Sequence, residues 1–219
     1  MDWRAIGDGI GWDITVDESD TNVAEPSGQS WSNAELHQAL LARRDASNLD
    51  AEWRYHVLAL RRIDATSRGI IYDAYGCDSN NVPREGCAIS SHWTIPNEVK
   101  WGNVKGMRFG TATGPFFRTA VHETGHAMGL YHNTADNGFI NTTGVIASNS
   151  LAPGSQAFPN NVQWSYNSEG TRRLRHMPDI YVRPGGTPFG ISYTSIPISP
   201  TDLREIVEGL KLNVKPLME

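Results

Sequence analysis

Eleven consecutive residues, from His122 to His132, carry the residue types that could do chemistry in this chain. They read His-Glu-Thr-Gly-His-Ala-Met-Gly-Leu-Tyr-His. On a helix, His122 and His126 lie four residues apart, so their imidazoles project from one face and can hold one side of a metal ion. Gly129 adopts a positive φ at little cost, which would end the helix and bring His132 to the same ion. Three protein ligands leave a fourth position for water, as in catalytic zinc sites.

Glu123 stands next to the first of these ligands. From there its carboxylate can reach a water molecule on the metal without being a ligand itself, which is the role of a general base. A lone histidine on a helix is more often a hydrogen-bonded core residue than a ligand. Five specified positions at these offsets, however, would arise by chance in a chain of this length on the order of once in ten thousand. The pattern therefore predicts a zinc hydrolase.

The complete pattern His-Glu-x-x-His-x-x-Gly-x-x-His resembles the signature of the metzincin zinc metallopeptidases. The resemblance implies an endopeptidase that holds one Zn²⁺ and hydrolyses peptide bonds with a zinc-bound water, assisted by Glu123. Metzincins also place a methionine in a tight turn beneath the metal. Met177 is the candidate here, because the other methionine that follows His132 is Met218, next to the C-terminus. Asn133, directly after the third ligand, matches no major branch, so no subfamily is assigned.

Other segments predict the elements that must position these residues. Ser32 and Glu35 form a capping box at the start of a helix that runs to about Asp45. Pro115 is well placed at the first position of the zinc helix, and Ser199 begins a C-terminal helix. Five segments have the composition and alternation of strands: Trp12–Val16, Trp53–Ile63, Gly69–Tyr75, Cys87–Thr94 and Met107–Thr111.

This order of elements is similar to that of the metzincin catalytic domain over nearly the whole chain. The resemblance implies one α+β domain of residues 1–219, with an α/β-like upper subdomain over about residues 1–131. That upper part would hold a five-stranded, twisted, mostly parallel sheet and two helices above the cleft. The lower subdomain, about residues 132–219, would be irregular and would carry the Met-turn and the C-terminal helix. Residues 133–176 are rich in Asn, Ser, Thr and Gly, which predicts mostly loops.

Metzincin substrates bind in extended form along an exposed edge strand of the sheet. The segment Ala88–Trp93 is expected to be that edge, which makes Ile89 and Ser90 candidate substrate-binding residues. Tyr181 is a candidate for the wall of a subsite. His92 lies on the same segment, but the signature already supplies three ligands, so a surface position is expected for it.

The two cysteines, Cys77 and Cys87, flank a polar segment rich in turn residues. A disulfide between them would staple this loop and would imply an oxidising compartment, and hence a secreted protein. Two free thiols in a cytosolic protein are the alternative. Acidic residues near the N-terminus offer oxygen ligands for calcium, but they lack the spacing of a calcium loop, so a solvated acidic turn is expected at Asp17, Glu18 and Asp20.

The composition describes one ordinary globular domain: 219 residues, of which 39% are hydrophobic and 20% charged. No apolar run approaches the roughly 18 residues that a membrane span needs. A formal net charge of −5 and the absence of a basic block argue against nucleic acid as a partner. The N-terminal residues show no signal-peptide pattern. We expect a monomer that acts on a protein or peptide substrate.

Two other functions stay open at this point. The chain could be a peptide-binding module that keeps the fold and the zinc but does not turn over, although an intact Glu123 argues against that. It could also be a zinc hydrolase, such as a toxin, that is specific for one partner or for a non-protein amide.

Overall fold

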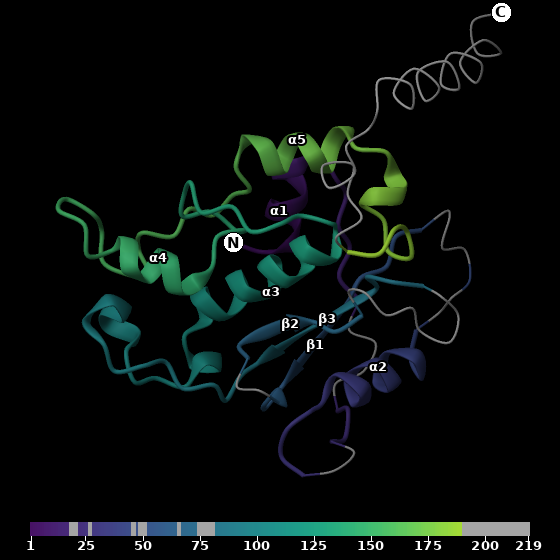
Figure 1. Cartoon of the computed structure of the whole chain (residues 1–219), viewed down its shortest axis with the longest axis horizontal. Coiled ribbons are helices and arrows are strands. Elements are labelled where there is room, and N and C mark those ends of the chain that lie inside the picture. Colours follow the sequence, from purple (N-terminus) through teal and green to yellow (C-terminus); the bar gives the residue numbers. More distant parts are fainter. Residues whose placement is uncertain are drawn as a thin grey trace, which may run out of the picture.

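The computed structural model describes residues 1–17, 22–25, 28–44, 47, 52–64, 67–73 and 82–189. They form a mixed α+β structure, as the sequence predicts, in which a small sheet lies among helices (Figure 1). The α-helices are α1 (Trp3–Ile10), α2 (Asn33–Leu41), α3 (Thr113–Ala127), α4 (Thr143–Asn149) and α5 (Ser168–His176). The strands are β1 (His56–Leu60), β2 (Gly69–Ile71) and β3 (Gly86–Ser90), and the 3₁₀ helices are η2 (Val99–Val104), η3 (Phe109–Thr111) and η4 (Asp179–Tyr181).

The sheet of the described residues has three strands in the order β1-β3-β2. The central strand β3 pairs in parallel with β1, where Cys87 lies opposite Val57. It pairs antiparallel with β2, where Ala88 lies opposite Ile70. Three of the five predicted strands are therefore present, in one parallel and one antiparallel pair rather than in a mostly parallel sheet.

The other two predicted strands take different conformations. Trp12–Val16 forms no strand. The ring of Trp12 instead lies edge to face against that of Trp53, at a centroid distance of 5.3 Å. Met107–Thr111 makes one isolated bridge to Thr94 and then closes into η3, where Phe109 is fully buried in a core cluster. In the second segment the burial of a large aromatic ring accounts for the apolar position without a strand, whereas in the first Trp12 is only partly buried and Val16 is exposed.

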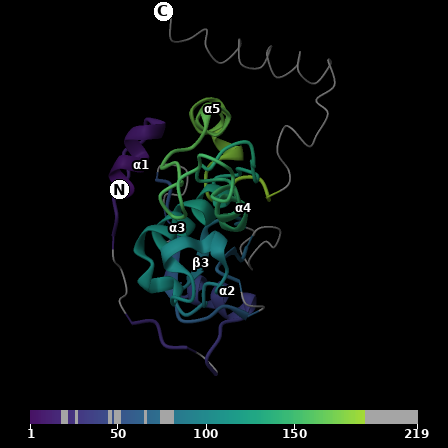
Figure 2. The ribbon, with the colours of Figure 1, turned by 90° about the vertical axis from the view of Figure 1, so that its left-hand side faces the viewer.

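The helix that carries His122 and His126, α3, is one of four stacked layers. Both views show α2, the sheet, α3 and α5 one above another (Figure 1, Figure 2). Leu36 of α2 and Ala88 of β3 belong to one core cluster, and Val121 of α3 shares a second cluster with Ile10 of α1 and Leu174 of α5. Because α3 lies between the sheet and the outer helices, its whole second half is buried.

The helix start predicted at Ser32 is confirmed. The side chain of Ser32 accepts a hydrogen bond from the backbone N–H of Glu35, and the Glu35 carboxylate accepts one from the backbone N–H of Ser32 at 2.8 Å. Trp31 and Leu36, which flank this box, are 2% and 0% exposed and lie in the same cluster. The helix ends at Leu41; Asp45 lies outside the described residues.

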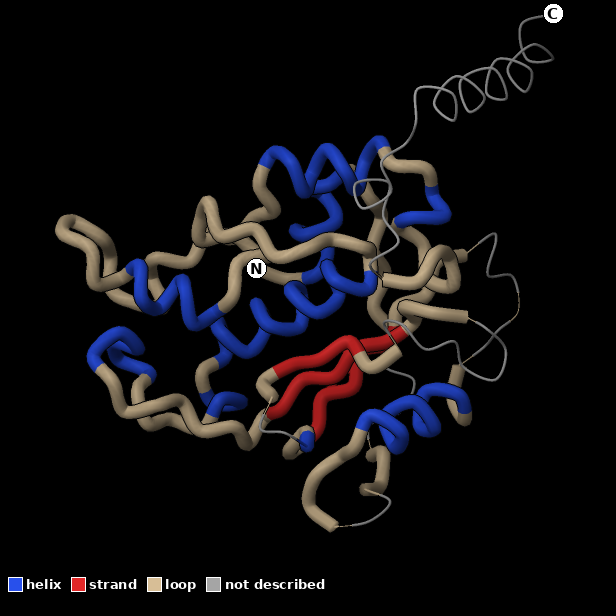
Figure 3. Tube along the Cα trace, viewed as in Figure 1, coloured by secondary structure: helices blue, strands red, loops and turns tan. Residues whose placement is uncertain are grey.

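Polar residues start three further helices that the sequence analysis did not predict. The side chains of Asp2, Thr142 and Asn167 accept hydrogen bonds from backbone N–H groups and so cap α1, α4 and α5. The prediction of loops for residues 133–176 is therefore only partly correct (Figure 3). The predicted helix from Ser199 lies outside the described residues. None of the described helices has the length and apolar character to cross a membrane.

Candidate metal centre

The helix α3 carries the first two histidines and ends as the sequence predicts. It begins at Thr113, two residues before the predicted start, so Pro115 lies in the first turn, where its missing N–H leaves no hydrogen bond unmade. Two residues past the last helical residue, Gly129 has φ 83°. A Cβ at this position would lie 2.5 Å from the carbonyl oxygen of Tyr181. Both the left-handed turn and the close approach of another chain segment thus require glycine here.

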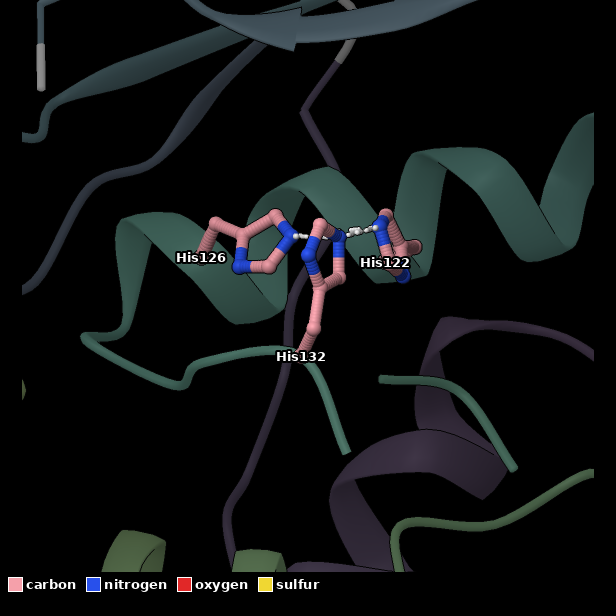
Figure 4. A group of neighbouring side chains, drawn as sticks. All are labelled: His122, His126 and His132. Atoms are coloured by element: carbon pink, nitrogen blue, oxygen red, sulfur yellow. Dashed lines mark hydrogen bonds between the residues drawn. The ribbon is translucent and has the colours of Figure 1, made fainter. Parts of the chain in front are cut away.

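The imidazoles of His122, His126 and His132 point toward one another (Figure 4). The Nε2 atom of His126 lies 3.1 Å from each of the other two, and those two are 3.2 Å apart. Two nitrogens that bind one tetrahedral zinc at about 2.0–2.1 Å lie about 3.3–3.4 Å apart. The three nitrogens therefore stand at the separation that one metal ion requires, and they are the one group of this kind among the described residues.

Backbone carbonyls fix which ring nitrogen faces the centre of the triad. Nδ1 of His122 lies 2.7 Å from the carbonyl oxygen of Phe139, and Nδ1 of His126 lies 2.7 Å from that of Leu130. A carbonyl only accepts, so each Nδ1 carries the proton and donates it. Each Nε2 then keeps its lone pair free to bind a metal, which is the usual arrangement of metal-binding histidines.

Burial also favours the neutral form of these imidazoles. It lowers the pKa of His126 to about 4 and that of His122 well below its usual value, where the neighbouring His126 and Arg118 add to the effect. The pKa of His132 is lowered by burial and by Arg118, although this residue is more exposed than the others. Neutral imidazoles are the form that binds metal ions.

Glu123, the residue after the first histidine, is buried, with 8% of its surface exposed. Its side chain lies directly against Gly69 of β2: a Cβ on Gly69 would be 2.5 Å from the carboxylate oxygen Oε1. Burial raises the pKa of Glu123 to about 8, while the positive charges of Arg68 and Arg118 lower it. A dication held by the histidines would lower it further. A carboxyl with a pKa in this range can exchange a proton near neutral pH, as a general base must.

Arg118, which the sequence analysis did not single out, lies one turn before His122 in α3 and is fully buried. Its guanidinium donates hydrogen bonds to Thr143 Oγ1 and to the carbonyl oxygens of Gly138, Phe139 and Asn141. Burial lowers its pKa to about 9, so it is charged at neutral pH. The four-residue spacing from His122 is the signal that could have revealed it, because it places both side chains on one helix face.

Arg84 joins the sheet to the segment that follows α5. It is 1% exposed, has φ 61°, and donates hydrogen bonds to the carbonyl oxygens of Ala127, Ile180, Val182, Arg183 and Thr187. The segment held in this way leads to Phe189. The ring of Phe189 packs on that of His126 at a centroid distance of 5.7 Å and on that of Tyr131 at 5.0 Å. Arg84, two residues before β3, thus ties the end of α3 to the segment that leads to an aromatic neighbour of the triad.

The roles predicted for Met177 and Tyr181 stay predictions. Met177 follows α5 directly and is partly buried against the core cluster that contains Met128 and Leu130. Tyr181 ends η4, and its backbone carbonyl is the atom that approaches Gly129. The expectation that Met177 lies beneath the metal, and that the Tyr181 ring lines a subsite, rests on the resemblance to the metzincins.

The prediction that Ala88–Trp93 is the exposed edge is wrong. Ile89 and Ser90 lie in β3, which pairs on both sides, and they are 3% and 2% exposed. A strand with neighbours on both edges has no free backbone groups to offer a peptide. Among the described strands, the edge that lies beside Glu123 is β2, which begins at Gly69.

Cys87 is buried and forms no disulfide within the described part of the chain; its Sγ lies 3.7 Å from Thr124 Oγ1, and Cys77 lies outside the described residues. A disulfide between the two cysteines stays a prediction. Of the acidic residues considered for calcium, Asp17 is exposed, and Glu18 and Asp20 lie outside the described residues.

Comparisons of the chain with protein-family models, with curated proteins and with solved structures found no match. What the site can do therefore has to be argued from its own geometry.

Proposed function

We propose that this chain is a zinc-dependent endopeptidase. One observation carries the proposal: three imidazole Nε2 atoms stand 3.1–3.2 Å apart, with the Nδ1 protons of His122 and His126 held by backbone carbonyls and a buried carboxylate next to the first ligand. Unprotonated nitrogen donors at tetrahedral spacing suit Zn²⁺. Three ligands, of which His132 is exposed, leave room on the open side for water and a substrate carbonyl.

His122, His126 and His132 would hold the ion, which when bound acidifies water and polarises a carbonyl group. Glu123 would accept a proton as water attacks the peptide carbonyl, and would then give that proton to the leaving amine. Its contact with Gly69 restricts the carboxylate to the side of α3 that faces β2, so the proton would be exchanged at a defined place.

An extended peptide would pair with the edge strand β2. This strand begins at the residue that touches Glu123, so a peptide along it passes the general base. Main-chain hydrogen bonds to an edge strand hold a peptide largely independently of its sequence. Such pairing favours an endopeptidase over a hydrolase for a small amide.

The test is digestion of casein and of a mixed peptide library, with the zinc-loaded chain, the chelator-treated chain, and the variants Glu123→Gln and Glu169→Gln. Glu169 is an exposed carboxylate that pairs with Arg172 and Arg173 in α5, so it is a matched control. We expect chelator and Glu123→Gln each to lower turnover, the latter by about 10²–10⁴-fold with zinc retained, and Glu169→Gln to leave it unchanged.

The same experiment separates the alternatives. Peptide binding without any cleavage would show a binding module. Cleavage of a small non-protein amide or of a single protein, with casein and the library untouched, would show a hydrolase of narrow specificity. Either result would overturn the proposal.

A further inference from the structure

Arg68 lies directly before β2, the edge strand with which a substrate peptide is proposed to pair. Its carbonyl accepts a hydrogen bond of 2.7 Å from the backbone N–H of Ser90, which anchors it to the central strand. The next residue, Gly69, touches the Glu123 side chain. Arg68 is therefore the chain neighbour of the residue at which Glu123, the proposed general base, contacts β2.

Two indole rings hold the Arg68 side chain. Its guanidinium carbon lies 5.1 Å from the ring centroid of Trp93 and 5.9 Å from that of Trp101. A guanidinium that rests on aromatic faces keeps its N–H groups, which lie in its own plane, for a hydrogen-bonding partner. The residue as a whole is only partly buried.

Neighbouring cations already have their partners, whereas Arg68 has no ion pair within the described part of the chain. The guanidinium groups of Arg84 and Arg118 are fully buried and bind backbone carbonyls. Lys100 also lies over Trp101, at 5.8 Å, but it pairs with Glu98 at 2.9 Å. Arg68 interacts electrostatically with Glu123 but forms no salt bridge with it. A preorganised cation beside a substrate strand, with its hydrogen-bonding groups not engaged by a carboxylate, is suited to bind one from a ligand.

Resting on the proposed function, we propose that Arg68 selects the substrate: a peptide that carries an Asp or Glu side chain close to the bond to be cleaved. An extended peptide rises about 3.3 Å per residue, so a guanidinium next to the Glu123 contact reaches side chains within about three residues of that bond. A planar guanidinium binds a carboxylate through two parallel hydrogen bonds, which an amide side chain cannot reproduce.

The experiment measures kcat and KM for a peptide series in which one Glu is moved through three positions on either side of the cleaved bond. Each peptide has a matched partner with Gln at the same position. The parent chain is compared with Arg68→Met, which keeps an apolar side chain for the two indoles, and with Lys100→Met as the control cation. Tryptophan fluorescence of the zinc-free chain with the same peptides gives the Kd independently of cleavage.

We expect at least one position where Glu is preferred to Gln by about tenfold or more in kcat/KM and in Kd. Arg68→Met should reduce that preference to less than about twofold, and Lys100→Met should keep it. The absence of an acidic preference, or a preference that survives in Arg68→Met, would overturn the assignment. An equal loss of kcat for all peptides in Arg68→Met would also overturn it, because Arg68 would then act only as the counter-ion of Glu123.

The two proposals fail in different ways. If no peptide is cleaved but the fluorescence titration still prefers Glu in the parent and not in Arg68→Met, the peptidase proposal fails and the binding role of Arg68 stands. If peptides are cleaved without regard to charge, the role of Arg68 fails and the peptidase proposal stands.

Discussion

Arg118 and His122 share one hydrogen-bond acceptor, the backbone carbonyl of Phe139. The guanidinium donates to it at 2.9 Å and the imidazole Nδ1 at 2.7 Å. The arginine thus holds in place the group that orients the first candidate metal ligand. Groups that orient a ligand in this way change metal affinity when they are removed.

Replacing Arg118 should therefore weaken zinc binding. In Arg118→Met the carbonyls of Gly138, Phe139 and Asn141 lose the guanidinium as a donor. We therefore expect zinc Kd to rise about 10–100-fold, measured by competition with a chromophoric chelator. Arg118→Lys keeps the charge and one donor, and should show a smaller rise if the methionine variant fails to fold. Arg173→Met, which removes an arginine paired with Glu169, is the control. An unchanged Kd in both Arg118 variants would leave this residue a purely structural role.

The triad itself should bind one zinc ion per chain. His126→Ala removes the ligand whose Nε2 lies 3.1 Å from each of the other two, so it should lose both the metal and turnover. His176→Ala removes an exposed imidazole at the end of α5 and should retain both. The measurement is elemental analysis of the purified proteins after dialysis. Equal zinc content in the two variants would refute the assigned ligands.

The sequence predicted the cluster of three histidines because its geometry is local. A spacing of four residues on a helix and one glycine fix the relation of His122, His126 and His132 almost completely. The carbonyl of Phe139, by contrast, comes from 17 residues further on, and a backbone group has no residue type by which it could be recognised. The role of Arg118 could not be predicted from the sequence for the same reason, because three of its four hydrogen-bond partners are backbone carbonyls.

The strand order was not predictable from local patterns. The segment that contains Ile89 alternates weakly and reads equally well as an edge or as a centre. Its central place is decided by pairing with β1, about 30 residues earlier in the chain, and with β2 on the other side. Gly69 likewise reads as an ordinary strand start, and only the tertiary structure brings it against Glu123.

Asp73 should make stability depend on pH. Burial raises the pKa of this carboxyl to about 7, although the N–H of Glu85 donates to it at 2.6 Å and lowers the pKa. The unfolded chain releases this proton near pH 3.8, so between about pH 4 and pH 7 the folded state holds one more proton than the unfolded state. Stability from this group should therefore fall as pH rises through that window, by at most about 1.4 kcal/mol per pH unit.

The measurement for Asp73 is urea unfolding at several pH values in the presence of a chelator, which removes the pH dependence of metal binding. Asp73→Asn should lose the contribution of this group, so that its stability falls less steeply with pH than that of the parent, while Asp8→Asn, at an exposed site in α1, should keep the slope of the parent. A parent and an Asp73→Asn variant with parallel pH profiles would contradict the raised pKa.

The contact between Gly69 and Glu123 gives the sharpest test of the proposed general base. A Cβ at position 69 would lie 2.5 Å from Oε1, 2.6 Å from Cγ and 2.8 Å from Cδ of Glu123. These atoms belong to a flexible side chain, so Gly69→Ala should displace the carboxylate rather than unfold the protein. A misplacement of about 1 Å can lower turnover by about 10²-fold.

We therefore expect Gly69→Ala to keep its zinc and most of its thermal stability while kcat falls by tenfold or more. Gly144→Ala, in α4 with no atom within 4 Å of the added methyl group, is the matched control, and should leave kcat unchanged and stabilise its helix by up to about 1 kcal/mol. Zinc content, thermal unfolding and kcat of the two variants decide the matter. A normal kcat in Gly69→Ala would mean that the position of Glu123 against β2 does not matter for the reaction, and the proton-transfer role assigned to it would have to be withdrawn.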